Sequence, residues 1–284
     1  MTLPADAHVH SEWSWDSGSD PASPGRMRRT CERAVAIGLP ALIFTEHLDF
    51  EDSWKVDDGD MGEHAGSLVD ATGHVRLPPF DVDGYLESIE RCRREFEELR
   101  ILTGVEFGQP HLWDAEAHPL LSSGAIDRVN GSLHMLPLGD DGDRSEPTTL
   151  YRHESPDAVM RAYLDEIPRM VAGSDSFAVF THIDYAVRAW PTLTAGPFDP
   201  RRFEDGFRAG MRAIASSGRA LEMNTRRLWS WIPEWWAQEG GRAVTFGSDA
   251  HVPENLAANF PEATAMLESF GFRPGARPED FWRR

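Results

Sequence analysis

The chain has 284 residues, a length that suits one large α/β barrel or two domains of ordinary size. Hydrophobic residues make up 40% and charged residues 26% of it, a balance that argues against a disordered chain. The formal net charge of −19 disfavours a long nucleic acid as a partner, because an acidic surface repels a polyanion.

The N-terminus and the cysteines bear on where the protein works. The chain does not open on a basic flank followed by an apolar run, and no apolar segment has the length that a bilayer span needs. Cys31 and Cys92 both fall in predicted helices among charged residues, so we expect neither a disulfide nor a thiolate zinc site. We therefore expect a cytoplasmic protein that has no membrane partner.

Apolar runs alternate with helical patterns along almost the whole chain. The predicted strands are residues 3–8, 41–45, 101–106, 126–133, 177–182, 220–224 and 243–248. The predicted helices are residues 26–37, 83–99, 158–171, 203–216, 233–238 and 254–270, with Gly38 ending the first and Ser155 capping the third. Strands that alternate with helices of this length predict a parallel sheet in an α/β fold. Because no linker rich in Pro, Gly or Ser divides the chain, we expect one domain, residues 1–284.

Two acidic, glycine-containing stretches, residues 50–80 and 137–147, interrupt this alternation. One explanation is that both stretches are solvated surface loops. Both also follow strands, on the side where barrel enzymes place their active-site loops. Residues 50–80 are therefore also a candidate lid over a substrate.

Residues that can bind metal ions gather where the predicted strands end. His8 and His10 stand at positions i and i+2, so on an extended backbone their side chains point to the same face. The later strand ends carry His47, Glu106, His134, His182, Glu222, Asp249 and His251, and Asp16 lies in the loop behind the first strand.

Each of these residues taken singly could also have a structural role that does not involve metal. His47 or His134 alone could be a hydrogen-bonded structural histidine, and Glu106 could be a solvated strand end. However, six of the eleven histidines sit at strand ends, and the coincidence over seven strands favours a metal site. The remaining five are expected at the surface: His64, His74, His111, His118 and His153.

Nitrogen and carboxylate ligands without thiolates suit Zn²⁺, Mn²⁺ or Fe²⁺. Nine candidate ligands exceed what one ion takes, so we expect two or three divalent metal ions that share a bridging carboxylate. Clustered ions activate water and neutralise phosphoryl oxygens. This chemistry hydrolyses phosphate esters without a serine or cysteine nucleophile, and none stands out here.

The strand-end motifs resemble those of the polymerase-and-histidinol-phosphatase (PHP) superfamily, in the same order and over nearly the whole chain. They are Asp6-x-His8-x-His10, Thr45-Glu46-His47, Gly104-x-Glu106, Ser132-Leu133-His134, His182-x-Asp184 and Ser248-Asp249-Ala250-His251. The resemblance implies a distorted (β/α)7 TIM-like barrel with a metal site at the C-terminal ends of its strands.

The resemblance also implies how the ligands are shared. His8, His10, Glu106 and Asp249 would hold one ion, and Glu106 would bridge to a second ion held by His134 and His182. A third ion would be held by Asp16, His47 and His251. Asp16 departs from superfamily members that have histidine there, which puts the strength and identity of the third ion in doubt.

Within the superfamily, residues 45–50, 104–108 and 222–225 look most like the stand-alone histidinol-phosphate phosphatases. That similarity implies a phosphomonoesterase that converts L-histidinol phosphate, a small phosphorylated substrate, to L-histidinol and phosphate in histidine biosynthesis. The alternative is a PHP phosphodiesterase or nucleotidase acting on small nucleotides, oligonucleotides or cyclic phosphates. An amidohydrolase-type enzyme would show a bridging lysine, which no strand end offers, and a metal-storing barrel would not need the full ligand set.

A phosphate substrate needs a cationic side chain to bind its oxygens. Arginine is suited to this, because its guanidinium group can donate two parallel N–H hydrogen bonds to phosphate. Arg188 is the first candidate, followed by Arg226 and Arg227, although each could be a surface arginine. Asp249 or His251 could protonate the leaving group.

Other residues could support the site. Asp6 and Glu222 could orient ligating histidines, and Glu222 could instead bind a substrate amine. Four tryptophans are explained either by packing or as an aromatic wall for a substrate ring: Trp13, Trp15, Trp229 and Trp231.

Overall fold

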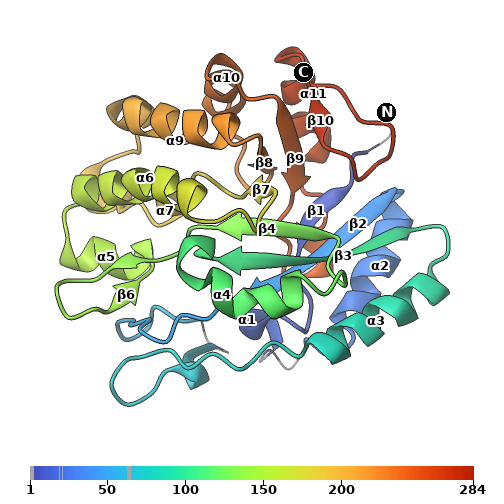
Figure 1. Cartoon of the computed structure of the whole chain (residues 1–284), viewed down its shortest axis with the longest axis horizontal. Coiled ribbons are helices and arrows are strands. Elements are labelled where there is room, and N and C mark those ends of the chain that lie inside the picture. Colours follow the sequence, from blue (N-terminus) through green and yellow to red (C-terminus); the bar gives the residue numbers. More distant parts are fainter. Residues whose placement is uncertain (1–2, 19, 21, 63–64) are drawn as a thin grey trace.

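The computed structural model describes residues 3–18, 20, 22–62 and 65–284. Its centre is a curled sheet, surrounded by helices (Figure 1). Within the described residues this sheet has eight strands in the order β1-β2-β3-β4-β7-β8-β9-β10. The expected α/β barrel of the PHP type is thus confirmed.

Seven of the strands run parallel and match the seven predicted ones. They are β1 (Asp6–Val9), β2 (Ala41–Leu48), β3 (Arg100–Gly108), β4 (Arg128–Ser132), β7 (Val179–Phe180), β8 (Ala220–Asn224) and β9 (Ala243–Gly247). The prediction of a six-residue strand over 177–182 was wrong in length, because only two residues pair there. β10 (Trp282–Arg283) was not predicted, since two residues carry no periodic pattern, and it pairs antiparallel with β9.

The curl of the sheet brings its first strand against the chain that follows β9. The backbone N–H of Asp249 donates to the carbonyl of His8 at 2.8 Å, and that of His10 donates to Ala250 at 2.9 Å. Strands far apart in the sequence therefore end around one common space, which is where the expected metal ligands lie.

Six helices correspond to predicted ones. They are α2 (Arg26–Ile37), α3 (Val82–Glu95), α6 (Pro156–Gly173), α9 (Glu204–Ser216), α10 (Trp231–Gln238) and α11 (Phe260–Ser269). Gly38 ends α2 in the left-handed conformation with φ 71°, and the side chain of Ser155 accepts the N–H of Ala158 at the start of α6. The helix expected over 254–270 is interrupted, because η3 (Pro253–Asn255) precedes a turn in which Asn259 has φ 57°.

Several short elements were not predicted. They are α1 (Trp15–Gly18), η1 (Ala65–Leu68), α4 (Pro110–Leu121), α5 (Pro147–His153), α7 (Tyr185–Arg188), α8 (Thr192–Ala195) and η2 (Pro200–Phe203). Most are too short to show a helical period. α4 is longer, but Pro119 lies inside it and Trp113 has non-helical φ and ψ, so its sequence does not have a regular helical pattern.

The two acidic stretches are more ordered than solvated loops. β5 (Leu136–Pro137) and β6 (Arg144–Ser145) form an antiparallel pair across the second stretch. The first stretch packs against that pair: Trp54 is buried with Val75 and Met135, and the N–H of Lys55 donates to the carbonyl of Arg144. The described residues of this stretch, 50–62 and 65–80, therefore form a wall beside the strand ends, and movement of the stretch as a lid stays a prediction.

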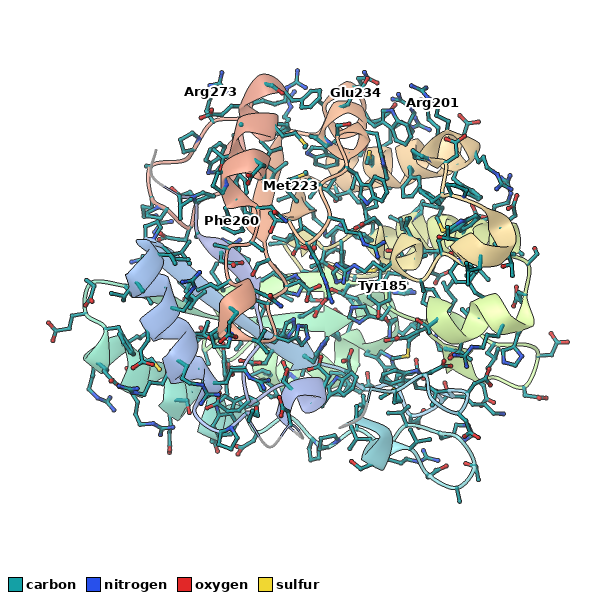
Figure 2. The ribbon with its side chains drawn as sticks, turned by 180° about the vertical axis from the view of Figure 1, so that it is seen from behind. Tyr185, Arg201, Met223, Glu234, Phe260 and Arg273 are labelled. Carbon is teal, nitrogen blue, oxygen red and sulfur yellow. The ribbon has the colours of Figure 1, made fainter. Side chains whose placement is uncertain are left out.

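Apolar packing surrounds the polar centre. The large buried side chains Phe44, Tyr163, Phe180, Phe207 and Phe260 fill the space between the sheet and the helices. Figure 2 shows labelled charged residues such as Arg201 and Arg273 at the periphery, and Met223 and Phe260 inside. Over the described residues, the structure contains no helix that is long and apolar enough to cross a membrane.

The expected surface histidines follow the prediction with one exception. His118 and His153 are exposed, and His74 lies on a loop where it pairs with Asp143. The expectation for His111 was wrong: it opens α4, packs against α6 and bonds to Glu166 at 2.8 Å with a side chain that is 8% exposed. His64 lies outside the described residues.

The end of α2 provides a test of local backbone geometry. Gly38→Ala should lower the free energy of unfolding by about 1 kcal/mol, because a residue with a Cβ is strained in the left-handed backbone conformation of Gly38. The added Cβ itself would contact no atom of the other described residues within 4 Å, its chain neighbours apart. Gly66→Ala adds the same methyl group in open space at an ordinary φ and should leave stability nearly unchanged. Urea unfolding measures both, and equal midpoints for the two variants would contradict this account of the helix end.

Candidate metal centre

His8 and His10 place two imidazole nitrogens side by side at the end of β1. Their Nε2 atoms are 3.1 Å apart. Oε2 of Glu106 lies 3.2 Å from Nε2 of His8 and 3.3 Å from Nε2 of His10. Oδ1 of Asp249 lies 3.8 and 3.5 Å from the same two nitrogens. A tetrahedral ion with bonds of about 2.0–2.2 Å spaces its ligand atoms about 3.3–3.6 Å apart, so these four side chains fit one divalent ion.

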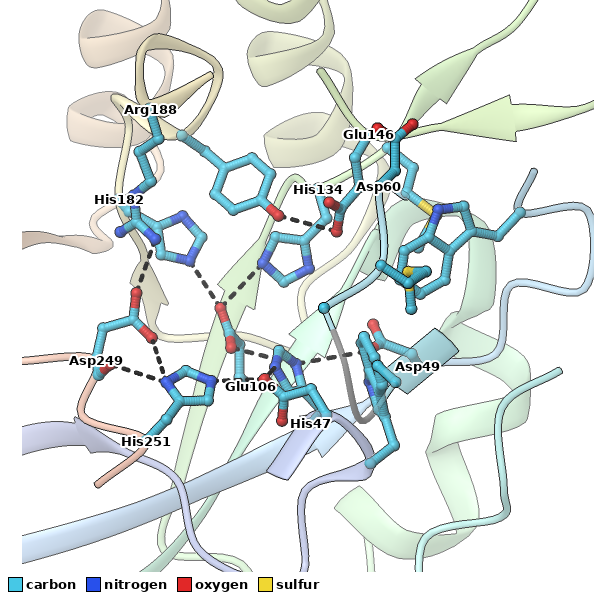
Figure 3. A pocket seen from close by; sticks show the side chains of 18 of the residues that line it. His47, Asp49, Asp60, Glu106, His134, Glu146, His182, Arg188, Asp249 and His251 are labelled. Carbon is cyan, nitrogen blue, oxygen red and sulfur yellow. Dashed lines mark hydrogen bonds and ion pairs between the residues drawn. The ribbon is translucent and has the colours of Figure 1, made fainter. Parts of the chain in front are cut away.

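The second oxygen of Glu106 faces a different pair of histidines. Oε1 lies 3.1 Å from Nε2 of His134 and 2.8 Å from Nε2 of His182 (Figure 3). The hydroxyl of Ser132 donates to the same oxygen at 2.6 Å, which fixes the carboxylate. Glu106 thus presents one oxygen to each of two clusters, as a bridging carboxylate does.

A third cluster lies between the first helix and the loop after β9. Nε2 of His251 lies 2.6 Å from Oδ2 of Asp16, and Nε2 of His47 lies 3.6 Å from the same oxygen. His10, His47 and His251 also bring ligand atoms within 4.8 Å of one another. The structure therefore gathers all nine expected ligands into three adjoining groups. Their binding of metal stays a proposal.

Electrostatics in the centre favour a cation. Burial raises the pKa of Glu106, but the charges of His8, His134 and His47 outweigh it and hold that pKa well below its ordinary value. Burial lowers the pKa of His47, yet Asp16 and Glu106 raise it to about 9. Carboxylates that draw protons onto neighbouring histidines will also draw a divalent metal ion to the same nitrogens.

Glu222 and Asp6 support the centre in different ways. Oε2 of Glu222 lies 2.6 Å from Nδ1 of His8, so Glu222 orients this ring, which is one of the two roles expected for it. The expectation that Asp6 orients a histidine was wrong. Its two oxygens accept the backbone N–H groups of Ser248 and Ala257, both at 2.9 Å, and so hold the loop that carries Asp249.

Arg188 lies beside the carboxylate expected to bind metal. Its Nη1 donates to Oδ2 of Asp249 at 2.8 Å, whereas its Nη2 is buried and has no hydrogen-bond partner among the described residues. Arg226 also lines the pocket. Arg227 instead points its guanidinium at the carbonyls of Val187 and Arg188, at 3.4 Å each. Arg188 and Arg226 are thus placed to meet an anion.

The pocket over these groups has a volume of about 390 Å³ and includes acidic residues that the sequence did not single out. They are Asp49, Asp60 and Glu146. Asp49 follows His47 by two residues and thus shares its face of the chain, a spacing that could have been noticed. Glu146 lies in the second acidic stretch and hydrogen bonds to the hydroxyl of Tyr185 at 2.9 Å. No sequence signal distinguishes it from its neighbours.

The structure separates the four tryptophans into those that pack against other parts of the protein and those that line the pocket. Trp15 lines the pocket, together with Trp54, and its indole donates to Asp49 at 2.9 Å. Trp229 donates to Asp184, and Trp231 packs on Phe207 at a ring distance of 4.6 Å. Trp13 packs under Gly84. Packing thus accounts for Trp13, Trp229 and Trp231, and only Trp15 of the four forms part of an aromatic wall.

Comparison with known proteins agrees with this geometry. The model of the PHP domain family matches residues 6–226, so the chain belongs to this family. A histidinol-phosphatase of Lactococcus lactis subsp. lactis (strain IL1403) is 26% identical over 276 residues, which cover 94% of this chain and 91% of the relative.

Two solved structures share the fold. The histidinol phosphate phosphatase of Lactococcus lactis, complexed with zinc, L-histidinol and phosphate, gives a TM-score of 0.75 at 24% identity and covers 98% of both chains. A Listeria monocytogenes protein gives a TM-score of 0.67 at 14% identity, covering 91% of this chain and 99% of that one. At these identities the structural likeness establishes the fold.

The geometry of the clusters predicts which side chains bind metal. His134→Ala and Asp249→Ala should each lose bound metal in elemental analysis, because each removes a ligand atom that its cluster cannot replace. His74→Ala removes a histidine that pairs with Asp143 away from the pocket and should keep the metal content of the unaltered protein. Equal metal content in all three variants would refute the assigned centre.

Proposed function

We propose that the protein is a metal-dependent phosphomonoesterase that hydrolyses L-histidinol phosphate to L-histidinol and phosphate. The observation that carries the proposal is the pairing of a carboxylate that faces two clusters, Glu106, with Arg188, whose Nη2 has no partner in the part of the chain that the structure describes. The Lactococcus lactis relative is named a histidinol-phosphatase, and it matches this chain along nearly its whole length. This likeness supports the same reaction. We place the reaction in the cytoplasm, as expected from the sequence.

The proposed cofactors are two or three divalent ions, with Zn²⁺, Mn²⁺ and Fe²⁺ as candidates. The donor set of histidines and carboxylates suits all three, and the presence of zinc in the related Lactococcus lactis structure favours zinc. Such ions supply an activated water and neutralise the charge of the phosphoryl oxygens. The ligands would be His8, His10, Glu106 and Asp249 for one ion, His134 and His182 with Glu106 for the next, and Asp16, His47 and His251 for the third.

The charged side chains of the pocket suit a substrate with a phosphate at one end and an amine at the other. Figure 3 shows Arg188 on one side of Glu106, next to His182 and Asp249, whereas Glu146, Asp60 and Asp49 lie on the other side. In our proposal Arg188 and Arg226 bind phosphate oxygens. The acidic side attracts the ammonium group of histidinol, and Trp15 and Trp54 border the space left for its ring.

A proton must reach the leaving alkoxide. Both candidates from the sequence, Asp249 and His251, line the pocket. Asp249 has one oxygen against Arg188 and the other towards His8 and His10, and its side chain is 6% exposed. The side chain of His251 is 31% exposed. We therefore favour Asp249 as a ligand in every case, and His251 as the proton donor when two ions are bound and the third site, which His251 would otherwise share with Asp16 and His47, is empty.

A substrate panel tests the reaction. With Zn²⁺ or Mn²⁺ present, L-histidinol phosphate should be hydrolysed with a higher kcat/KM than phosphodiesters, nucleoside monophosphates or cyclic phosphates, measured as phosphate or alcohol released. Protein stripped by a chelator should be inactive and should recover on adding metal. Preference for a diester would favour the phosphodiesterase alternative and leave the metal centre intact.

Glu146→Gln tests the amine end of the pocket. It should lower kcat/KM for L-histidinol phosphate by roughly tenfold or more, since a charge-assisted hydrogen bond is worth about 1.5–3 kcal/mol. The same variant should hydrolyse an aryl phosphate that lacks an amine as well as the unaltered enzyme does. Equal losses on both substrates would assign Glu146 to the general integrity of the pocket instead.

A further inference from the structure

Ser14 connects His10 to a second buried carboxylate. Oγ of Ser14 lies 2.9 Å from Nδ1 of His10, 2.7 Å from Oε2 of Glu46 and 3.1 Å from the backbone nitrogen of His47. The side chains of Ser14, His10 and Glu46 have no exposed surface. Buried polar groups need hydrogen-bond partners, so the protons in this cluster can be assigned by counting donors and acceptors.

The count begins at Glu46. Its Oε2 accepts the backbone N–H of Ser11 at 2.9 Å, and its Oε1 lies 2.6 Å from the hydroxyl of Ser11. Oε2 therefore acts as an acceptor and also takes the single hydroxyl proton of Ser14. The backbone N–H of His47 can only donate, and it uses one lone pair of Ser14 Oγ.

The remaining lone pair of Ser14 decides the state of His10. Having given its proton to Glu46, the hydroxyl can only accept from Nδ1 of His10, so this nitrogen must carry a hydrogen. A neutral imidazole carries one N–H, which leaves Nε2 as a free lone pair. That is the nitrogen facing Nε2 of His8, Oε2 of Glu106 and Oδ1 of Asp249.

We propose that Ser14 and Glu46 are positioning residues that hold His10 in the Nδ1–H tautomer and keep its Nε2 available to a divalent metal ion. The proposal rests on the metal centre of the proposed function. His8 has its partner carboxylate, Glu222, in direct contact, whereas Glu46 reaches His10 through a hydroxyl. The same hydroxyl also accepts from the backbone of His47, so one side chain aligns two proposed ligands. Glu46 of the Thr45-Glu46-His47 motif thereby gains a role that its sequence position did not reveal.

Zinc binding tests the proposal without relying on activity. Ser14→Ala leaves Nδ1 without its acceptor. Glu46→Ala removes the acceptor of the Ser14 proton, so this proton can turn towards Nδ1 of His10. Each should weaken zinc binding about 10- to 100-fold, the usual cost of losing a group that orients a ligating histidine. The dissociation constants are measured by competition with a chromophoric chelator, starting from the zinc-loaded enzyme.

Ser17→Ala is the matched control. Ser17 belongs to the short helix α1, directly beyond Ser14, and is buried, but its hydroxyl has no hydrogen-bond partner among residues 3–18, 20, 22–62 and 65–284. Its loss should leave zinc affinity unchanged. Unchanged affinity in both Ser14→Ala and Glu46→Ala, or an equal loss in Ser17→Ala, would overturn the proposal. An unaltered enzyme that binds neither zinc nor manganese would instead refute the proposed function.

The tautomer itself is a second readout that does not depend on how the variants fold. In ¹⁵N-histidine NMR spectra of the unaltered enzyme, recorded with zinc and after its removal, His10 should show a protonated Nδ1 in both states. The His10 signals are assigned by their loss in His10→Asn, and circular dichroism checks that the stripped protein stays folded. An unprotonated Nδ1 of His10 in either state would overturn the proposal. If removal of zinc unfolds the protein, the chelator competition decides.

Discussion

The buried carboxylate of Glu106 is the group on which the rest of the centre depends. Five histidines place a ring nitrogen within 3.3 Å of it: His8, His10, His47, His134 and His182. A buried carboxylate costs several kcal/mol unless charges and hydrogen bonds compensate it. These histidines come from four parts of the sheet, so compensation requires the strand ends to meet. The backbone bonds that join His8 and His10 to the chain after β9 provide that closure.

Close approach of the strand ends also needs small residues at the right positions. A Cβ on Gly247 would lie 2.6 Å from Cβ of His8 and 2.8 Å from Oε2 of Glu222, the pair that orients the first ligand. A Cβ on Gly108 would lie 1.9 Å from Oδ1 of Asp49. Glycine at both positions therefore leaves room for a polar centre inside the barrel. Glycine loses more backbone entropy on folding than other residues, and the contacts of His8, Glu222 and Asp49 that these glycines permit offset that loss.

Charge is separated within the pocket although the chain as a whole is strongly acidic. Arg188 stands beside Asp249 and His182, whereas Asp49, Asp60 and Glu146 stand on the opposite side of Glu106 (Figure 3). Net charge could only disfavour long polyanions as partners. The separation of charge inside a pocket of about 390 Å³ is what favours a small molecule that carries both a phosphate and an amine.

The sequence by itself determined the parallel strands, most of the longer helices and the positions from which the proposed metal ligands come, because periodicity and strand-end chemistry are local properties. Tertiary structure decided the rest. Asp6 holds a loop instead of a histidine, and Glu146 enters the pocket from a stretch that looked like solvated loop. Ser14 links Glu46 to His10 from the turn after β1. These roles depend on contacts between residues from separate elements, and such contacts exist only once the sheet has curled and closed.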